Sequence, residues 1–278
     1  MNFDTFPLEA PFNLKLTLES GQFFQWRPYT NGFLIQHRKH FFYIEQEKHF
    51  LRFASILDEV HPELIRDLFR LNDDLQGIYN QWDDPILNTA REAYRGLRLM
   101  RQDPWECTLS FLCSMASNIP RITGNLRTLS ERFGTVQDTE HGVSYRLPSP
   151  QELAQASLDE LYESGVGFRA KYLYRISREI QAGFSLNALQ DIAYPEAKTQ
   201  LMTLHGIGEK VADCILLFSL NFLEAFPVDT WITKILKQYY FPGRKSSPYK
   251  LAALARAHFG EYAGYAQQYL FHYARHML

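Results

Sequence analysis

Residues 204–229 read LHGIGEKVADCILLFSLNFLEAFPVD, and the interpretation of the whole chain starts from them. Gly206 and Gly208 allow a tight turn, so we interpret the start of this stretch as the hairpin of a helix-hairpin-helix. The helix expected to follow, from about Glu209 to Leu220, points its free N–H groups beyond the turn. Such a helix end binds anions, so the two glycines predict a site for a DNA phosphate.

Two chemically active side chains follow the hairpin. Lys210 lies in the first turn of the expected helix, where the helix dipole and partial burial favour the uncharged, nucleophilic amine. Cys214 follows one helical turn later on the same face. Asp229 can cap the next helix, which keeps its carboxylate ionised beside the amine. In the alternative interpretation, Lys210 only binds a phosphate and Asp229 is only a helix cap.

Length and composition predict a globular protein of one or two domains. The chain has 278 residues, of which 46% are hydrophobic and 15% aromatic, so a sizeable core is expected. No apolar run is long enough to span a bilayer, and the N-terminus MNFDTFPLEA lacks the features of a signal peptide. We therefore expect no membrane contact and a cytoplasmic location, with nucleoid association if the source is prokaryotic.

Cysteine content and net charge limit the chemistry further. The three cysteines, Cys107, Cys113 and Cys214, form no CxxC pair, which indicates reduced thiols in a reducing compartment. They are too few for a four-cysteine iron–sulfur cluster, and the sequence contains no other metal-ligand cluster. A net charge of −2 does not by itself favour nucleic-acid binding, but backbone amides at helix ends bind phosphates without any net charge.

Residues from about 12 to 55 are expected to form an antiparallel sheet. Leu14, Leu16 and Leu18 alternate with polar residues, which is typical of a strand. The segment Tyr29-Thr30-Asn31-Gly32 carries a hairpin-type turn, and apolar strands are expected after it at 33–35 and 41–44.

Helices are expected from about Asp58 onward. Pro104 opens what we expect to be the central buried helix, at 105–116. Further helices are predicted at 87–99, 149–159, 173–182, 189–201 and 231–240. The predicted fold class is α+β, with an N-terminal antiparallel sheet domain at 1–84 and a mostly helical domain at 85–278 that contains the helix-hairpin-helix at about 195–221.

The stretch 204–229 resembles the 8-oxoguanine DNA glycosylase/AP lyase family of helix-hairpin-helix glycosylases. That family combines a glycine hairpin, a catalytic lysine and a Pro-Val-Asp segment, which stand here as Gly206, Gly208, Lys210 and Pro227-Val228-Asp229. The resemblance covers nearly the whole chain. It implies a bifunctional enzyme that flips 8-oxoguanine out of duplex DNA, attacks C1′ with Lys210 assisted by Asp229, and nicks the strand by β-elimination.

The resemblance also implies a pocket for the oxidised base. Gly21 matches a family glycine whose carbonyl accepts the N7–H that 8-oxoguanine has and guanine lacks, although its spacing alone fits a plain turn glycine. Gln267 and Phe271 match residues on the Watson–Crick edge and one ring face, although they also fit an ordinary amphipathic helix. Cys214 would then line the other face.

Contacts with the rest of the DNA are implied at two further segments. Asn118 and Arg121 match a DNA-facing loop of the family, in which Arg121 would bond the cytosine opposite the lesion. The alternative interpretation of this segment is a plain polar turn into a helix, with Arg121 on a solvated face. Phe168 matches an aromatic wedge and Arg169 a second cytosine contact, where plain packing is the alternative. Ala116 stands where the family usually has an asparagine that fills the space left by the flipped base.

The expected partner is double-stranded DNA containing 8-oxoguanine, bound by a monomer that requires no cofactor. A structural monovalent or divalent cation at the hairpin, held by backbone carbonyls, is the one ion expected. Two alternatives stay open: a glycosylase for another damaged base, and a non-catalytic helix-hairpin-helix DNA-binding protein. Monofunctional relatives that act on alkylated bases typically lack a lysine at this position, so Lys210 argues against them.

Overall fold

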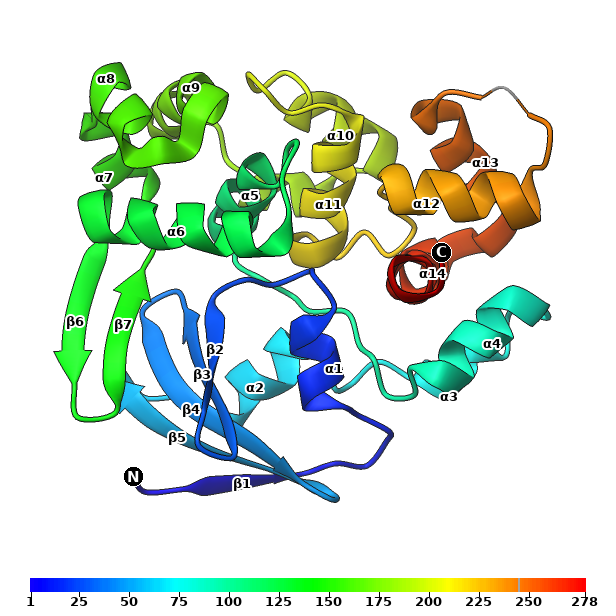
Figure 1. Cartoon of the computed structure of the whole chain (residues 1–278), viewed down its shortest axis with the longest axis horizontal. Coiled ribbons are helices and arrows are strands. Elements are labelled where there is room, and N and C mark those ends of the chain that lie inside the picture. The colour runs from blue at the N-terminus through cyan, green and yellow to red at the C-terminus, as the bar shows by residue number, and fades with distance from the viewer. Residues whose placement is uncertain (245) are drawn as a thin grey trace.

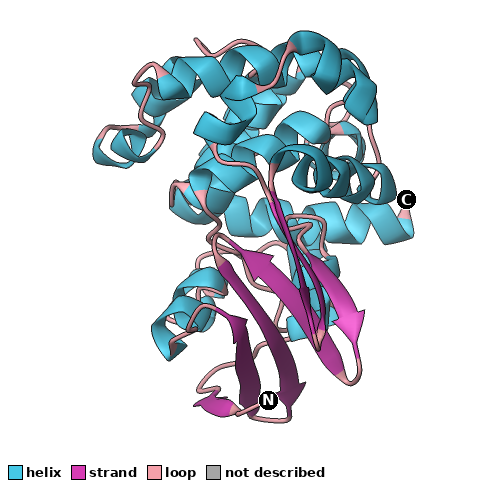
Figure 2. Ribbon diagram, turned by 90° about the vertical axis from the view of Figure 1, so that its left-hand side faces the viewer, coloured by secondary structure: helices cyan, strands magenta, loops and turns pink. Residues whose placement is uncertain are grey.

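The computed structural model describes residues 1–244 and 246–278, in which an antiparallel sheet precedes a mostly helical body (Figure 1). The sheet has five strands in the order β1-β5-β4-β3-β2. Its strands are β1 (Asp4–Pro7), β2 (Trp26–Tyr29), β3 (Gly32–His37), β4 (His40–Glu47) and β5 (Phe50–Leu57). Figure 2 shows the sheet on one side of the helical body, so the predicted α+β fold class is confirmed.

The helical body begins after the sheet and continues to the C-terminus. A small hairpin of β6 (Thr135–Thr139) and β7 (Gly142–Arg146) interrupts it. The helices are α2 (Pro62–Leu68), α3 (Leu75–Tyr79), α4 (Pro85–Ala93), α5 (Pro104–Cys113), α6 (Ile119–Phe133), α7 (Pro150–Gln155), α8 (Leu158–Leu161), α9 (Ala170–Gln181), α10 (Tyr194–Leu201), α11 (Glu209–Ser219), α12 (Thr230–Ile235), α13 (Pro248–Phe259) and α14 (Ala263–Met277). None of the described helices is long and apolar enough to cross a membrane.

The strand expected at residues 14–18 is wrong, because this segment forms the helix α1 (Leu14–Glu19). The Asn13 side chain caps the helix by accepting a bond from the Leu16 N–H at 2.9 Å. Leu14 and Leu18 lie one helical turn apart and are buried, whereas Leu16 is only partly buried. Three leucines at every second position fit either structure, and the cap decides for the helix.

The predicted hairpin at residues 29–32 is confirmed. Tyr29 and Gly32 face each other in the β2–β3 ladder, and Thr30 takes a left-handed φ of 47° between them. The strands expected at 33–35 and 41–44 lie within β3 and β4. The β6–β7 hairpin was not predicted, and it is joined to β3 by a 2.5 Å hydrogen bond from Ser144 Oγ to Gln36 Oε1.

The predicted central helix is confirmed as α5, in which every residue is buried. Asp103 caps it by accepting bonds from the backbone N–H groups of Trp105 and Glu106 at 2.9 and 3.1 Å. Cys107 and Cys113 lie in its core, and burial raises the pKa of the Cys113 thiol to about 12. All three cysteines are buried free thiols, as the sequence predicted.

The helices expected at 87–99, 149–159 and 189–201 are shorter than predicted, and the last begins only at Tyr194, after the extended residue Ile192. The helix expected to reach Leu99 ends at Ala93, because Gly96 takes a φ of +88° and packs against the backbone of Asn13. An added Cβ at Gly96 would lie 2.9 Å from Asn13 N. The helix expected at 149–159 is broken by the extended residue Ala156 into α7 and α8, each with its own capping box. The domain boundary at residue 84 stays a prediction.

The loss of the α1 cap is expected to destabilise the protein. Asn13→Ala should lower the free energy of unfolding by about 1 kcal/mol, whereas Asn13→Asp, which can still cap, should leave it close to that of the wild type. Urea unfolding of the three proteins measures the difference. Equal stability of the alanine variant and the wild type would contradict the role of the cap.

Candidate active site

The hairpin predicted from the sequence joins α10 to α11. Gly206 takes a φ of +95°, and an added Cβ would lie 2.5 Å from the ring of Tyr172. Both the backbone conformation and the lack of space therefore require glycine here. Gly208 is the N-cap of α11 and has open space beside it. Its φ of −97° does not itself require glycine, so the open space is what lets a ligand approach the helix end.

A buried ion pair fixes α10 against α11. Lys198 Nζ, on α10, lies 3.0 Å from Asp213 Oδ2 and 2.5 Å from Glu209 Oε2, both on α11. The Tyr194 hydroxyl donates to Asp213 Oδ1 at 2.7 Å. Burial raises the pKa of Asp213, against the opposing effect of Lys198. The sequence reading missed this cluster, although Asp213 stands between Lys210 and Cys214.

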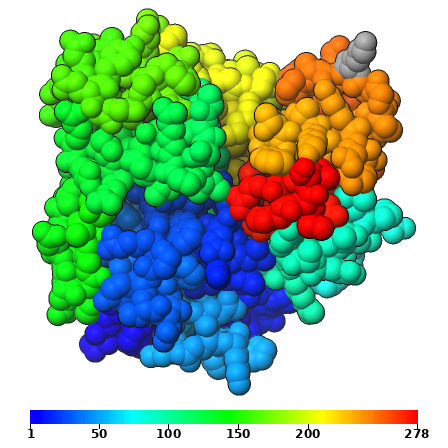
Figure 3. Space-filling model, viewed as in Figure 1, coloured from blue at the N-terminus to red at the C-terminus, as the bar shows by residue number. Residues whose placement is uncertain are grey.

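A cavity of about 650 Å³ lies beside the start of α11. It is open where α6, α14 and the N-terminal segment meet on the face shown in Figure 3. Residues from distant parts of the chain line it together. Those predicted from the sequence are Gly21, Asn118, Lys210, Cys214, Asp229, Gln267 and Phe271.

Lys210 presents its amine to this cavity. Its Nζ donates to Ser114 Oγ at 3.0 Å and lies 5.0 Å from the centre of the Phe111 ring. Among residues 1–244 and 246–278, no ion pair joins Lys210 to a carboxylate. The amine is therefore held by a neutral hydroxyl and an aromatic face.

Asp229 is the N-cap of α12, as predicted. Its Oδ1 accepts a bond from the Ile232 N–H at 2.8 Å. Burial raises the pKa of Asp229, while the Ile232 bond and the charge of Lys210 act to lower it. The expectation that capping alone sets its ionisation is therefore incomplete, because burial outweighs the cap.

Cys214 forms part of the cavity wall below Lys210. The side chain is buried, and burial raises the pKa of its thiol to about 12. The thiol is therefore protonated at neutral pH and acts as a neutral wall rather than as a nucleophile.

Gln267 and Phe271 lie one turn apart on α14. The Gln267 amide donates from Nε2 to Pro227 O at 3.1 Å, which leaves Oε1 buried and without a hydrogen-bond partner in the described part of the chain. Because Oε1 can only accept hydrogen bonds, it is an unsatisfied acceptor that an N–H donor on a ligand would satisfy.

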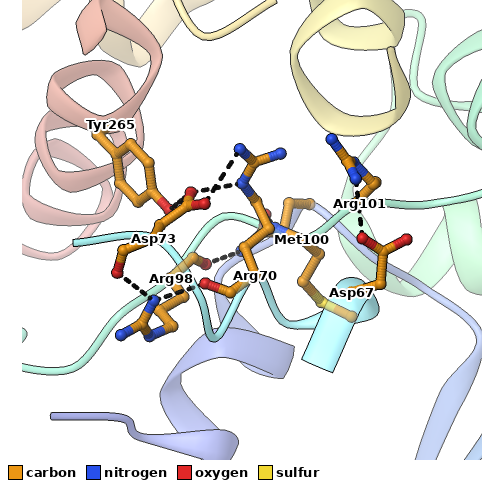
Figure 4. Close-up of polar contacts among 8 residues, drawn as sticks. Asp67, Arg70, Asp73, Arg98, Met100, Arg101 and Tyr265 are labelled. Carbon is orange, nitrogen blue, oxygen red and sulfur yellow. Dashed lines mark hydrogen bonds and ion pairs between the residues drawn. The ribbon is translucent and has the colours of Figure 1, made fainter. Parts of the chain in front are cut away.

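Buried contacts on another side of α14 fix this helix in place (Figure 4). The Tyr265 hydroxyl donates to Asp73 Oδ2 at 2.5 Å, and Arg70 Nε donates to the same oxygen at 2.7 Å. Arg98 Nη1 donates to the backbone carbonyls of Arg70 and Asp73 at 2.6 and 3.1 Å. Tyr265 is only two residues before Gln267, so these contacts help to hold the part of α14 that carries Gln267.

Gly21 takes a φ of +82°, a conformation that favours glycine. An added Cβ would lie 3.3 Å from both Ile119 Cδ1 and Arg275 Nη1 and 3.4 Å from the Phe271 ring. The interpretation as a turn glycine is therefore correct, but this turn also lines the cavity.

The backbone on either side of Gly21 is clamped by amide side chains. Gln268 Nε2 donates to the carbonyl of Ser20 at 3.2 Å, and Gln102 Nε2 donates to that of Gln22 at 2.7 Å. The Gln22 side chain is fully buried and accepts from the Met100 N–H at 2.8 Å. These glutamines were not predicted, since their partners are remote in sequence.

Three of the predicted DNA contacts lie outside or at the edge of the cavity. Asn118 caps α6 by accepting from the Arg121 N–H at 3.0 Å, and both residues are exposed. Phe168 is 50% exposed, although large apolar side chains are usually buried, and it stands edge-on to Tyr172. An exposed aromatic ring of this kind can insert between stacked bases.

Arg169 differs from its prediction, because only 1% of it is exposed. Its guanidinium donates to the backbone carbonyls of Met115, Ala116 and Val166 and lies over the Phe168 ring. Ala116 itself has a left-handed φ of 46°. Arg169 thus holds the 114–118 loop in this structure and does not face solvent, so a contact with cytosine requires it to leave these carbonyls.

Comparison with known proteins identifies the class first. Residues 110–259 match the family described as HhH-GPD superfamily base excision DNA repair protein, and residues 6–108 match 8-oxoguanine DNA glycosylase, N-terminal domain. A probable N-glycosylase/DNA lyase of Methanothermobacter thermautotrophicus is 31% identical over 95% of this chain and 94% of its own length. N-glycosylase/DNA lyase OGG1 of Arabidopsis thaliana is 38% identical over 68% of this chain and 54% of its own length.

Solved structures agree with these sequence matches. The apo form of Clostridium acetobutylicum 8-oxoguanine glycosylase/lyase is 30% identical, with a TM-score of 0.92 over 98% of this chain and 96% of that one. Its complex with double-stranded DNA containing cytosine opposite 8-oxoG superimposes with a TM-score of 0.90 over 99% of both chains, again at 30% identity. The chain therefore belongs to the 8-oxoguanine DNA glycosylase/AP lyase family.

The raised pKa of Asp229 predicts that its charge costs stability. The folded pKa lies above the unfolded one, so the cost is present at pH above the folded pKa and disappears as the pH falls below the unfolded pKa. Asp229→Asn keeps the cap without the charge and should be at least as stable as the wild type at pH 7. Asp229→Ala should lie about 1 kcal/mol below the asparagine variant because it loses the cap.

Urea unfolding of the three proteins at pH 7 and at pH 3 measures these differences. The advantage of Asp229→Asn over the wild type should shrink at pH 3. An asparagine variant that is less stable than the wild type at pH 7 would show that the ionised carboxylate stabilises the fold.

Proposed function

We propose that the protein is a bifunctional DNA glycosylase/AP lyase that excises 8-oxoguanine from double-stranded DNA. One observation carries the proposal: a single cavity contains an amine, a carboxylate and a set of groups suited to an oxidised purine. Family membership supports the same reaction.

The base must first leave the duplex, which costs a few kcal/mol. Phe168, exposed at a turn before α9, would insert into the stack beside the vacated position. Arg121, exposed on the first turn of α6, would bond the cytosine left behind. Arg169 would add a second bond to this cytosine after leaving the carbonyls of the 114–118 loop.

Recognition of the base would then use a backbone carbonyl, an unpaired amide oxygen and two walls of the cavity. The Gly21 carbonyl would accept the N7–H of 8-oxoguanine and repel the bare N7 of guanine. Gln267 Oε1, buried and without a partner, would accept an N–H from the Watson–Crick edge. Phe271 and Cys214 would cover the two faces of the ring.

Bond cleavage would follow at C1′ of the flipped nucleotide. The C1′–N9 bond breaks with its electron pair passing to the base, and the sugar becomes cationic, as in glycoside hydrolysis. The carboxylate of Asp229 would stabilise that positive charge. Lys210 Nζ would attack C1′ as a free amine, release a proton, and form a Schiff base with the opened sugar. Removal of a C2′ proton then expels the 3′ phosphate by β-elimination.

Further parts of the proposal concern the state of the protein. It would act as a monomer in the cytoplasm without a cofactor, with a sheet domain at 1–84 and a catalytic domain at 85–278. The described residues contain no group of three or more His, Cys, Asp or Glu side chains that could hold a metal ion. A monovalent or divalent cation at the hairpin would therefore depend on backbone carbonyls near Gly206.

Borohydride reduction tests the covalent step. The wild type should give a stable adduct with duplex DNA carrying 8-oxoguanine, because borohydride reduces the Schiff base to an amine. Lys210→Gln should give none, since an amide cannot form a Schiff base.

The outcomes separate the candidate functions. An adduct formed only with a duplex carrying another lesion would show that this family member has a different substrate. A wild-type protein that binds DNA but forms no adduct with any lesion or abasic site would contradict the lyase mechanism. The remaining hypothesis would then be a non-catalytic DNA-binding protein.

Gly21→Ala should separate base recognition from strand nicking. Its φ and the atoms around it leave little room for a Cβ, so the Gly21 carbonyl should shift and excision of 8-oxoguanine should slow by at least about tenfold. Cleavage of a preformed abasic site, which offers no base, should stay at the wild-type rate. Equal loss of both activities in single-turnover assays would argue against a role in reading the base.

A further inference from the structure

Arg275 continues the row of base-facing residues on α14. It lies one helical turn beyond Phe271 and two beyond Gln267, and all three side chains line the cavity. Apart from Lys210, it is the only Lys or Arg among the described lining residues. Arg275 carries no local sequence signal that distinguishes it from other arginines on an amphipathic helix.

The contacts of Arg275 leave one donor unused. Nη2 donates to the backbone carbonyl of Glu19 at 3.1 Å, and the guanidinium lies 5.8 Å from the centre of the Phe271 ring. Nη1 is buried and has no hydrogen-bond partner within the described residues, and no ion pair with a carboxylate is formed there either. Burial lowers the pKa of Arg275, while Tyr94 and Glu19 act to raise it.

Arg275 as a whole is only partly buried, but its Nη1 is a buried donor without a hydrogen-bond partner among the described residues, which is costly unless a ligand supplies an acceptor. This unpaired nitrogen lies beside Gly21. It is 3.3 Å from the position that a Cβ on Gly21 would occupy. The unused donor therefore lies beside the backbone of Gly21, the residue whose carbonyl would meet N7 in the proposed function. A ligand atom that accepts a hydrogen bond, and that gains negative charge during the reaction, would satisfy it.

The positions of the two carbonyl oxygens of 8-oxoguanine indicate which of them Arg275 would meet. 8-Oxoguanine has two carbonyl oxygens, and O6 lies toward the Watson–Crick edge, which Gln267 would read. The other carbonyl oxygen, O8, is on the carbon next to N7 and points away from that edge. Because Arg275 is two turns from Gln267 and adjacent to Gly21, O8 is the oxygen within its reach.

We propose that Arg275 is a catalytic residue that donates a hydrogen bond from Nη1 to O8 and stabilises the departing base. When the C1′–N9 bond breaks, its electron pair passes to N9 and is shared with O8 through C8, so negative charge develops at O8. The base then takes up a proton, while Lys210 releases one on forming its bond to C1′. This inference rests on the proposed function and extends it to the leaving group.

Single-turnover excision with protein in excess over DNA tests the proposal. Arg275→Met keeps much of the side chain's length without the charge or the donor, and should slow excision of 8-oxoguanine on the order of 100-fold. Cleavage of a preformed abasic site by the same variant should stay within about twofold of the wild type, because no base departs. Arg95→Met, which removes an exposed arginine outside the cavity, is the charge-matched control and should change neither rate.

Three outcomes would overturn the proposal. If the excision defect of Arg275→Met disappears at saturating protein, Arg275 binds a phosphate or contributes only affinity. If excision and abasic-site cleavage fall equally in a folded variant, Arg275 only supports the cavity wall. If Arg275→Lys, which keeps a charge, is no faster in excision than Arg275→Met, charge at this position plays no part.

The test also distinguishes this inference from the proposed function. A wild-type protein that neither excises 8-oxoguanine nor forms the borohydride adduct would refute the proposed function. An active wild type together with an equally fast Arg275→Met variant would refute the role of Arg275 alone.

Discussion

An amine and a carboxylate line the same cavity in this protein, and no ion pair joins them in the described part of the chain. A direct ion pair would engage both groups with each other, yet each has a different partner. The hydroxyl of Ser114 accepts from the amine, and the first turn of α12 donates to Asp229. The proposed function depends on this separation, because Asp229 would then stabilise a cationic sugar while the amine of Lys210 attacks its C1′.

Three sets of buried polar contacts hold the elements around that pair. Lys198 and Asp213 fix the two helices of the hairpin, Asp73 and Tyr265 fix α14, and Gln102 and Gln268 clamp the turn at Gly21. Each set joins parts of the chain that are supplied by different helices or loops. Such contacts contribute little net stability for their number, but they define one geometry, which the proposed discrimination against guanine would require.

The sequence identified the parts of the site that carry local signals. The glycine hairpin, the lysine in the first turn of α11 and the aspartate cap of α12 are each recognisable within a few residues, and the structure has all of them. Prediction failed where a long-range contact decides. Arg169 is buried by carbonyls from a distant loop, and the place of Arg275 beside Gly21 joins the two ends of the chain. The leucines at 14–18 are a different case, because the cap by Asn13 that makes them helical is a local signal that the alternating pattern concealed.

The turn at Gly21 separates two parts of the proposed reaction along the chain. It follows α1 in the first tenth of the chain, whereas Lys210 and Asp229, the groups proposed to break the bond, come from α11 and the start of α12. Under the proposed function, substitutions in the turn, or in the glutamines that hold it, would change which lesion is accepted and leave the nicking chemistry intact. Lesion preference and strand cleavage would then be open to separate engineering.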